Sequence, residues 1–163
     1  MKNRLFFVVS GEHRTLPHAE IRAILQAQRI DFKETAASTK LLRVTADPSA
    51  LSAVASRSVM FEQCGIEIAA TSPGKKRLFS LLSRTNLSRH FAKTRSFAVR
   101  SLRIGGALRY INRASLEREI GAILHENGHG VKVNLDRPEV TFLCIVSSRG
   151  LLLGKVTHSR VPG

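Results

Sequence analysis

The sequence is poor in several residue types, and each shortage narrows what the chain can be. It has no Trp, one Tyr and two Met among 163 residues, so we expect a core built mostly from Leu, Ile, Val, Ala and Phe. Its two cysteines, Cys64 and Cys144, stand within apolar runs and lack the spacing of a metal site. They therefore indicate buried thiols in a reducing compartment.

Long hydrophobic runs are also missing. No apolar stretch approaches the roughly 20 residues that a membrane-spanning helix needs. The opening segment Arg4–Ser10 contains an apolar run of five residues, which is shorter than the ~7–15 residues of a secretory signal. We expect this segment to form the first β-strand of a cytoplasmic protein that has no membrane partner.

Acidic residues are scarce, because 12 Asp and Glu stand against 26 Lys and Arg, for a net charge of +14 at pH 7. Residues 1–70 hold nine basic and seven acidic residues, whereas residues 71–163 hold 17 and five. From Lys75 to Arg113 there are eleven basic residues and no acidic one. Such a segment repels itself and attracts polyanions, so it indicates a nucleic-acid partner. Eighteen of the basic residues are Arg, whose planar guanidinium suits phosphates and base edges.

The change in charge coincides with the turn-forming cluster Thr71-Ser72-Pro73-Gly74, which predicts a boundary between domains 1–72 and 73–163. In the first domain, apolar periodicity predicts the order strand, helix, strand, strand, helix, strand. The expected strands are 4–10, 31–35, 40–45 and 59–70, and the helices begin at Thr15-Leu16-Pro17 and Asp47-Pro48-Ser49. This order is typical of the ferredoxin-like arrangement, so the predicted fold class is α+β.

The second domain begins with a helical pattern over residues 75–92, interrupted near Asn86. A second helix is expected to be capped by Ser115 and to end at Asn127-Gly128, since Gly commonly follows a helix end. Strands are expected over 95–104, 131–135, 140–146 and 151–156. The second domain is therefore predicted to be an α/β domain.

One motif points to enzyme chemistry. His125-Glu126-Asn127-Gly128-His129 matches the H-E-x-x-H signature of zinc proteases, which needs both histidines on one continuous helical turn. Asn-Gly interrupts that turn, so a helix end is the favoured interpretation and no metal is expected. The sequence contains no nucleophile elbow, Walker loop or glycine fingerprint, so we expect this chain alone to be no enzyme.

The favoured site is the basic segment from Arg103 to Ala114, which leads from a strand into a helix N-terminus, where phosphates are attracted. The only Tyr of the chain lies in this segment and is able to stack on a base, although packing over the helix end is an equal alternative. Further cations stand at the predicted boundary and near the hairpin that follows the helix. The predicted RNA-binding residues are Arg100, Arg103, Arg109, Tyr110, Arg113, Lys132, Arg137, Lys75, Lys76 and Arg77.

Several segments resemble a known family. Ser10-Gly11-Glu12, Thr15-Leu16-Pro17 and Ala19-Glu20-Ile21 resemble the opening of archaeal tRNA guanine-N2 methyltransferases that modify the guanosine at position 10. Phe97-Ala98-Val99-Arg100 through Arg103, Ser115-Leu116-Glu117 with Gly121, and residues 133–140 (Val-Asn-Leu-Asp-Arg-Pro-Glu-Val) resemble a THUMP domain. The resemblance covers essentially the whole chain. It implies a ferredoxin-like domain followed by a THUMP domain, a pair that recognises tRNA around its 3′ acceptor end.

The sequence departs from that family in one respect. The methyltransferases continue into a Rossmann-like catalytic domain with an Asn/Asp-Pro-Pro-Tyr motif, and this sequence has no such motif. S-adenosylmethionine would bind that domain, so no cofactor is expected in this chain. The resemblance leaves three expectations: the tRNA-binding part of such a methyltransferase, with the catalytic domain in cis; a stand-alone THUMP adaptor that presents tRNA to a modifying enzyme in trans; or the RNA-binding part of a 4-thiouridine synthetase. The remaining alternative is a ferredoxin-like regulatory protein whose positive charge does not serve RNA binding.

Overall fold

The computed structural model describes residues 1–127 and 130–160, and the chain divides into two compact units. Unit 1 contains Met1–Glu67 together with the described residues from Val156 onward, and unit 2 contains Ile68–Lys155. Strands β4 (Phe61–Thr71) and β8 (Gly150–Ser159) each contribute residues to both units. None of the described helices is both long enough and apolar enough to cross a membrane.

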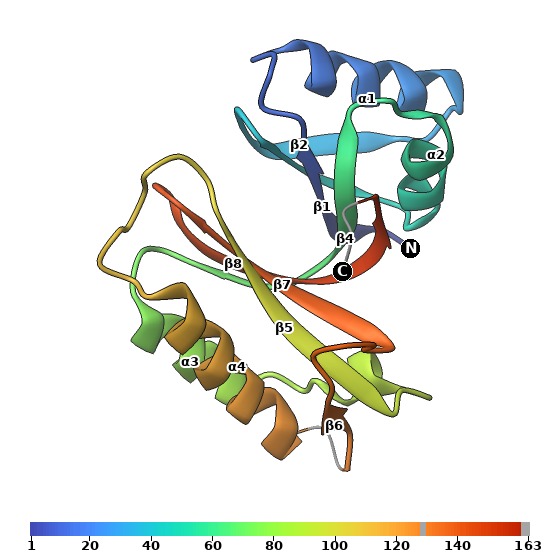
Figure 1. Cartoon of the computed structure of the whole chain (residues 1–163). Coiled ribbons are helices and arrows are strands. Elements are labelled where there is room, and N and C mark those ends of the chain that lie inside the picture. Colours follow the sequence, from blue (N-terminus) through green and yellow to red (C-terminus); the bar gives the residue numbers. More distant parts are fainter. Residues whose placement is uncertain (128–129, 161–163) are drawn as a thin grey trace. The chain divides into compact units, whose positions relative to one another are not determined.

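Unit 1 has the element order that the sequence predicts (Figure 1). Its remaining elements are β1 (Asn3–Val9), α1 (Leu16–Ala27), β2 (Phe32–Ser38), β3 (Leu41–Ala46) and α2 (Ser49–Arg57). The strand order is β2-β3-β1-β4, and β1 pairs antiparallel with both β3 and β4. This is the ferredoxin-like arrangement, so the predicted α+β class is confirmed.

The core of unit 1 lies between this sheet and its two helices. Alternate residues of β1 point to the helices, since successive side chains of a strand face opposite sides. Both helices contribute to the same buried cluster and therefore cover the same face of the sheet. The cluster includes Leu5, Phe7, Val9, Ile21, Leu25, Leu42, Val44, Ala50, Leu51, Val54 and Cys64.

Glu20, a half-buried residue of α1, binds the segment that links α2 to β4. Its carboxylate accepts hydrogen bonds from the Ser58 hydroxyl and from the backbone N–H groups of Val59 (3.0 Å) and Met60 (3.2 Å). Partial burial opposes ionisation, but these hydrogen bonds and the charge of Arg160 outweigh it and lower the pKa of Glu20. Glu20 belongs to the segment Ala19-Glu20-Ile21, which carries part of the resemblance to the methyltransferase family, and in this chain it has a structural role.

Unit 2 is built from the ends of β4 and β8 with six further elements. These are α3 (Lys75–Arg84), the 3-10 helix η1 (Ser88–Phe91), β5 (Ser96–Arg103), α4 (Arg113–Asn127), β6 (Lys132–Val133) and β7 (Val140–Ser147). The strand order is β8-β7-β5-β6. Strand β5 pairs parallel with β6 and β7, and β7 pairs antiparallel with β8. Helices α3 and α4 cover one face of this sheet (Figure 1).

Aromatic rings form the centre of the unit 2 core. The rings of Phe91, Phe97 and Phe142 lie with centroids 5.3–5.9 Å apart in tilted or edge-on contacts, which are the favourable arrangements for aromatic pairs. Both cysteines are buried and free, as the sequence indicates. Burial raises the pKa of the Cys64 and Cys144 thiols to about 12, so both remain protonated and unreactive near neutral pH.

Two local features differ from the prediction or sharpen it. Helix α4 begins at Arg113 rather than after Ser115, because Asn112 supplies the cap: its Oδ1 accepts from the N–H of Ser115 at 2.9 Å. The last hairpin requires glycine at Gly150, where φ is +135° and a Cβ would lie 1.9 Å from the carbonyl oxygen of Thr71. No other residue type fits this close approach of two backbone segments.

Candidate nucleic-acid interface

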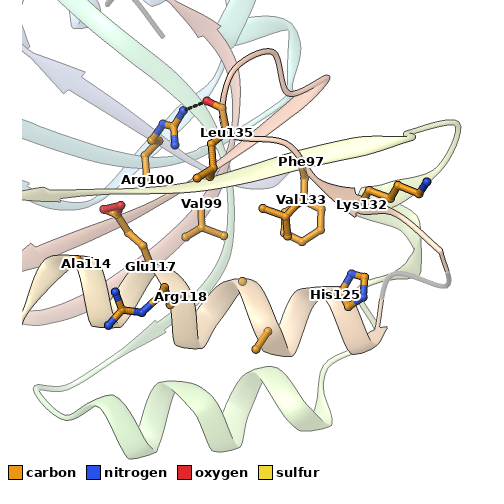
Figure 2. A pocket seen from close by; sticks show the side chains of 12 residues that line it. Phe97, Val99, Arg100, Ala114, Glu117, Arg118, His125, Lys132, Val133 and Leu135 are labelled. Carbon is orange, nitrogen blue, oxygen red and sulfur yellow. Dashed lines mark hydrogen bonds between the residues drawn. The ribbon is translucent and has the colours of Figure 1, made fainter.

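A groove with a volume of about 660 Å³ lies in unit 2 between β5, α4 and the segment that carries β6 (Figure 2). Its surface is mostly apolar, with side chains from all three elements. The apolar lining includes Phe97, Val99, Gly121, Ala122, Val133 and Leu135. Val133 is 50% exposed and Leu135 is 61% exposed. Large apolar side chains open to solvent in a concave site are typical of a ligand-binding surface.

The wall opposite α4 is held against β5 by hydrogen bonds. The N–H of Lys132 donates to the carbonyl of Arg95 at 3.0 Å, and the N–H of Asn134 donates to the carbonyl of Phe97 at 2.9 Å. The guanidinium of Arg100 then donates to the carbonyl of Leu135 at 2.6 Å, which is the contact drawn in Figure 2. These bonds keep the exposed apolar side chains of this wall facing a fixed floor.

Basic side chains lie at both ends of the groove. Arg118 and Arg100 lie toward one end, and His125 and Lys132 lie toward the other (Figure 2). Glu117 is the acidic residue of the lining, and its Oε2 accepts a hydrogen bond from the hydroxyl of Ser101 at 2.8 Å. The resulting surface combines an apolar floor with a rim of net positive charge.

Two of the predicted arginines hold their own unit together. The Nη2 of Arg103 donates to the carbonyls of Leu108, at 3.3 Å, and Ile111, so its partly buried guanidinium anchors the loop between β5 and α4. Arg113 donates from Nη2 to the carbonyl of Ser101 at 2.7 Å and from Nε to the Ser101 hydroxyl at 3.1 Å. Both side chains already bind protein atoms, and they position the loop.

The loop anchored in this way presents its other two predicted residues to solvent. Arg109 is exposed, and Tyr110 is 75% exposed. Leu108 has a positive φ of 51°, an uncommon conformation for a non-glycine residue. The Tyr110 ring therefore does not pack into the core and is available for stacking.

The remaining predicted residues are spread over unit 2. Lys132 lies on the groove with Arg100, and Arg137 is exposed in the segment after it. Lys75 pairs with Glu119 at 3.1 Å, on the facing helix. Arg77 donates to the hydroxyl of Ser72, and Lys76 is exposed. The structure places Arg100 and Lys132 toward opposite ends of the same groove (Figure 2) and leaves the residues of α3 outside it.

The residues of α4 that line the groove were missed by the sequence reasoning. Ala114, Arg118, Gly121, Ala122 and His125 follow one another at helical spacing along one side of α4. This side adjoins the apolar stripe that faces the core. The signal in the sequence was a second stripe, made of small and cationic residues, beside the apolar one.

The zinc-protease motif lies only partly within the described residues. Gly128 and His129 are outside them, and the Nδ1 of His125 lies 3.1 Å from the carbonyl oxygen of Val131. Within residues 1–127 and 130–160, no group of three or more His, Cys, Asp or Glu side chains is arranged to hold a metal ion.

Comparisons with known proteins give matches among solved structures. No protein-family model and no curated protein sequence matches the chain significantly. The structure is similar to that of TrmN from Thermus thermophilus, with a TM-score of 0.68 and 20% identity over 96% of this chain and 46% of that one. It is also similar to a protein described as a possible methylase from Clostridium difficile 630, with a TM-score of 0.71 and 11% identity over 96% of this chain and 41% of that one.

A third similar structure was solved with a nucleic acid. It is a 4-thiouridine synthetase in complex with RNA and bound ATP, with a TM-score of 0.63 and 14% identity over 94% of this chain and 41% of that one. At these identities the likeness establishes the fold. The chain spans less than half the length of these three proteins, so in each of them the same fold accompanies a further part.

Proposed function

We propose that this chain is the tRNA-binding module of a tRNA guanine-N2 methyltransferase. The observation that carries the proposal is the charge of unit 2, which holds sixteen basic and five acidic residues for a net charge of +11. A single ion pair, Lys75 with Glu119, joins side chains among its described residues. Cations that are not paired within the protein are available to phosphates, and releasing the counterions of RNA then favours binding.

The placement of these cations supports RNA over a generally basic surface. They border a groove with an exposed apolar wall and flank a loop that presents Tyr110. An A-form duplex offers side chains a shallow minor groove and phosphates, whereas unpaired bases offer faces for stacking. Apolar and aromatic surface beside cations therefore suits an RNA with an unpaired end, such as the acceptor end that the THUMP resemblance implies.

The similar structures support the two parts of the proposal separately. One is described as a possible methylase, and another was solved with RNA. In the proposed methyltransferase, S-adenosylmethionine and the chemistry belong to a further domain, and this chain holds the substrate in place. Correct placement of a bound substrate is itself a large contribution to catalysis.

The second candidate is the RNA-binding part of a 4-thiouridine synthetase, and the RNA-bound structure is the observation that favours it. The nucleoside that disappears when the gene is deleted separates the candidates. Mass spectrometry of digested tRNA should show loss of N2-methylguanosine for the methyltransferase. Loss of 4-thiouridine would support the second candidate, and loss of a different modified nucleoside would support an adaptor for another modifying enzyme.

Direct binding is tested by fluorescence anisotropy of labelled tRNA at increasing salt. We expect the logarithm of the association constant to fall linearly with the logarithm of the salt concentration. An acceptor-stem minihelix with its 3′ single strand should bind more tightly than the same helix trimmed blunt. Absence of binding at low salt, or affinity that does not change with salt, would refute the proposal.

A further inference from the structure

The groove between β5 and α4 has two properties that rarely suit the same ligand. Its floor and one wall are apolar, with Val133 and Leu135 of the wall open to solvent, and its rim carries Arg118 and Lys132. A free phosphate would gain nothing from contact with the apolar surface, and a purely apolar ligand would leave the cations of the rim without a partner. A nucleotide satisfies both, because its base has an apolar face and its phosphate is an anion.

Glu117 adds a third property, because a carboxylate in the lining repels a phosphate at that point. Its orientation is set by a relay in which Arg113 donates to the Ser101 hydroxyl at 3.1 Å, and this hydroxyl donates to Oε2 of Glu117 at 2.8 Å. An ionised carboxylate has about four lone-pair positions, so one hydrogen bond leaves acceptor capacity. The group that fits is a hydrogen-bond donor on an otherwise uncharged part of the ligand.

Exocyclic amino groups of nucleobases are such donors. Cytosine and adenine carry one on the edge that side chains read, and glutamate accepts from the cytosine amino group in known recognition. Uracil presents carbonyl oxygens at the corresponding positions and would place them against the carboxylate. A carboxylate in this place therefore discriminates between bases, which cations alone do not.

We propose, on the basis of the proposed RNA-binding function, that this groove receives an unpaired nucleobase bearing an exocyclic amino group. Glu117 accepts the hydrogen bond from that amino group, and the base lies on the apolar floor beside Val99. Arg118 and Lys132 contact the flanking phosphates. Arg113 and Ser101 are positioning residues, since they act through the carboxylate of Glu117.

The test uses the full chain and labelled tetranucleotides of cytidine, adenosine or uridine, with affinities measured by anisotropy at low salt. The wild type should bind the cytidine and adenosine strands about tenfold more tightly than the uridine strand, near the discrimination of one good base contact. Glu117→Gln should remove most of this preference, because an amide donates to the uracil carbonyl as well as it accepts from an amino group.

A second variant tests the groove without changing a charge. Ala122 is an exposed residue of the groove wall on α4, so Ala122→Leu should occupy the groove, leave the thermal unfolding temperature unchanged and weaken all three strands severalfold. The matched control is Ser80→Leu, an exposed small residue of α3 outside the groove, which should bind as the wild type does.

The possible outcomes separate this proposal from the proposed function. Equal wild-type affinity for all three strands, or an undiminished preference in Glu117→Gln, overturns the proposal of a base site. An Ala122→Leu variant that binds normally also overturns it, and an acidic peptide is then the better occupant of the groove. In each of these cases salt-dependent binding of tRNA would survive, whereas its absence would refute the proposed function itself.

Discussion

The two units of the chain use charge in opposite ways. Unit 1 carries ten basic and seven acidic residues, and unit 2 carries sixteen and five. Among the described residues, four of the five ion pairs lie in unit 1, although it has fewer basic residues. Among the described residues, unit 1 therefore places more of its charges in internal ion pairs, whereas unit 2 leaves most of its cations outside ion pairs.

The most buried of these pairs shows what internal pairing achieves. Arg43 of β3 meets Glu67 of β4 through two hydrogen bonds, of 2.6 Å and 3.1 Å, and the side chain of Glu67 is only 3% exposed. This two-pronged contact raises the pKa of Arg43. A charge-assisted pair with matched planar groups also fixes the geometry of the strands that carry it. Charge in unit 1 thus contributes to structure, and most cations of unit 2 lie outside such ion pairs.

The largest expected effect comes from breaking this pair. Arg43→Met should lower the free energy of unfolding by about 3–5 kcal/mol, because it leaves the buried Glu67 carboxylate without a partner. The decrease is measured by urea denaturation followed by circular dichroism, which suits a chain without Trp.

Two controls identify the cause of that decrease. The double variant Arg43→Met/Glu67→Met should recover most of the stability, since no buried charge remains. Arg109→Met, at an exposed position of unit 2, should change stability by less than about 0.5 kcal/mol. If Arg43→Met and Arg109→Met cost the same, the contrast between the units does not hold.

A smaller effect is expected on RNA binding from removing exposed cations of unit 2. Replacing Arg109, Arg118 and Lys132 with Gln should weaken tRNA binding by about 2–4 kcal/mol, at roughly 0.5–1.5 kcal/mol for each solvent-exposed hydrogen bond to a phosphate. The slope of log affinity against log salt should also decrease by about one for each phosphate that the variant no longer neutralises. Anisotropy titrations at several salt concentrations measure both quantities.

The matched control removes the same residue types from unit 1. Arg4, Arg14 and Lys33 are exposed, and their replacement with Gln takes the same net charge from the chain. We expect this triple variant to bind tRNA with nearly the affinity of the wild type. An equal reduction of affinity in the two triple variants would mean that total charge, rather than its placement in unit 2, determines binding.

The smallest effect is expected for Tyr110, which distinguishes two roles within unit 2. Tyr110→Ala should leave stability within about 0.5 kcal/mol of the wild type, because the ring is exposed. It should reduce the preference for an overhanging over a blunt minihelix by about 1–3 kcal/mol, the contribution of one stacked base. An unchanged preference with intact binding would assign end recognition to the groove alone.

Most of the fold could be predicted from the sequence, because it depends on local periodicity. The six elements of unit 1 and their order follow from alternating and helical apolar patterns. Element ends were less accurate: β8 runs over Gly150–Ser159, beyond the predicted 151–156, and the pattern 75–92 resolves into α3 and η1. Ends depend on caps and on pairing partners, and Asn112 rather than Ser115 caps α4.

The candidate site was predictable only in part. The excess of cations in the second half of the sequence is visible in its composition, and Arg100 and Lys132 do lie on one groove. The internal roles of Arg103 and Arg113 were not predictable, because the carbonyl groups that they bind come close only when the loop folds back. The positions of Arg118 and Glu117 in the groove could not be predicted from the sequence. Helical spacing shows which residues lie on the same side of α4, but it does not show which segment packs opposite them.

The amino-acid sequence by itself determined the types and order of the elements, the apolar cores and the uneven charge of the two halves. These properties depend on residue type and on spacing over a few positions, so they can be read without knowing which segments meet. The tertiary structure alone decided which cations are paired and which remain available, and it created the groove and the relay from Arg113 through Ser101 to Glu117. Those features join residues separated in the chain, since each depends on distances that exist only after β5, α4 and β6 have packed together.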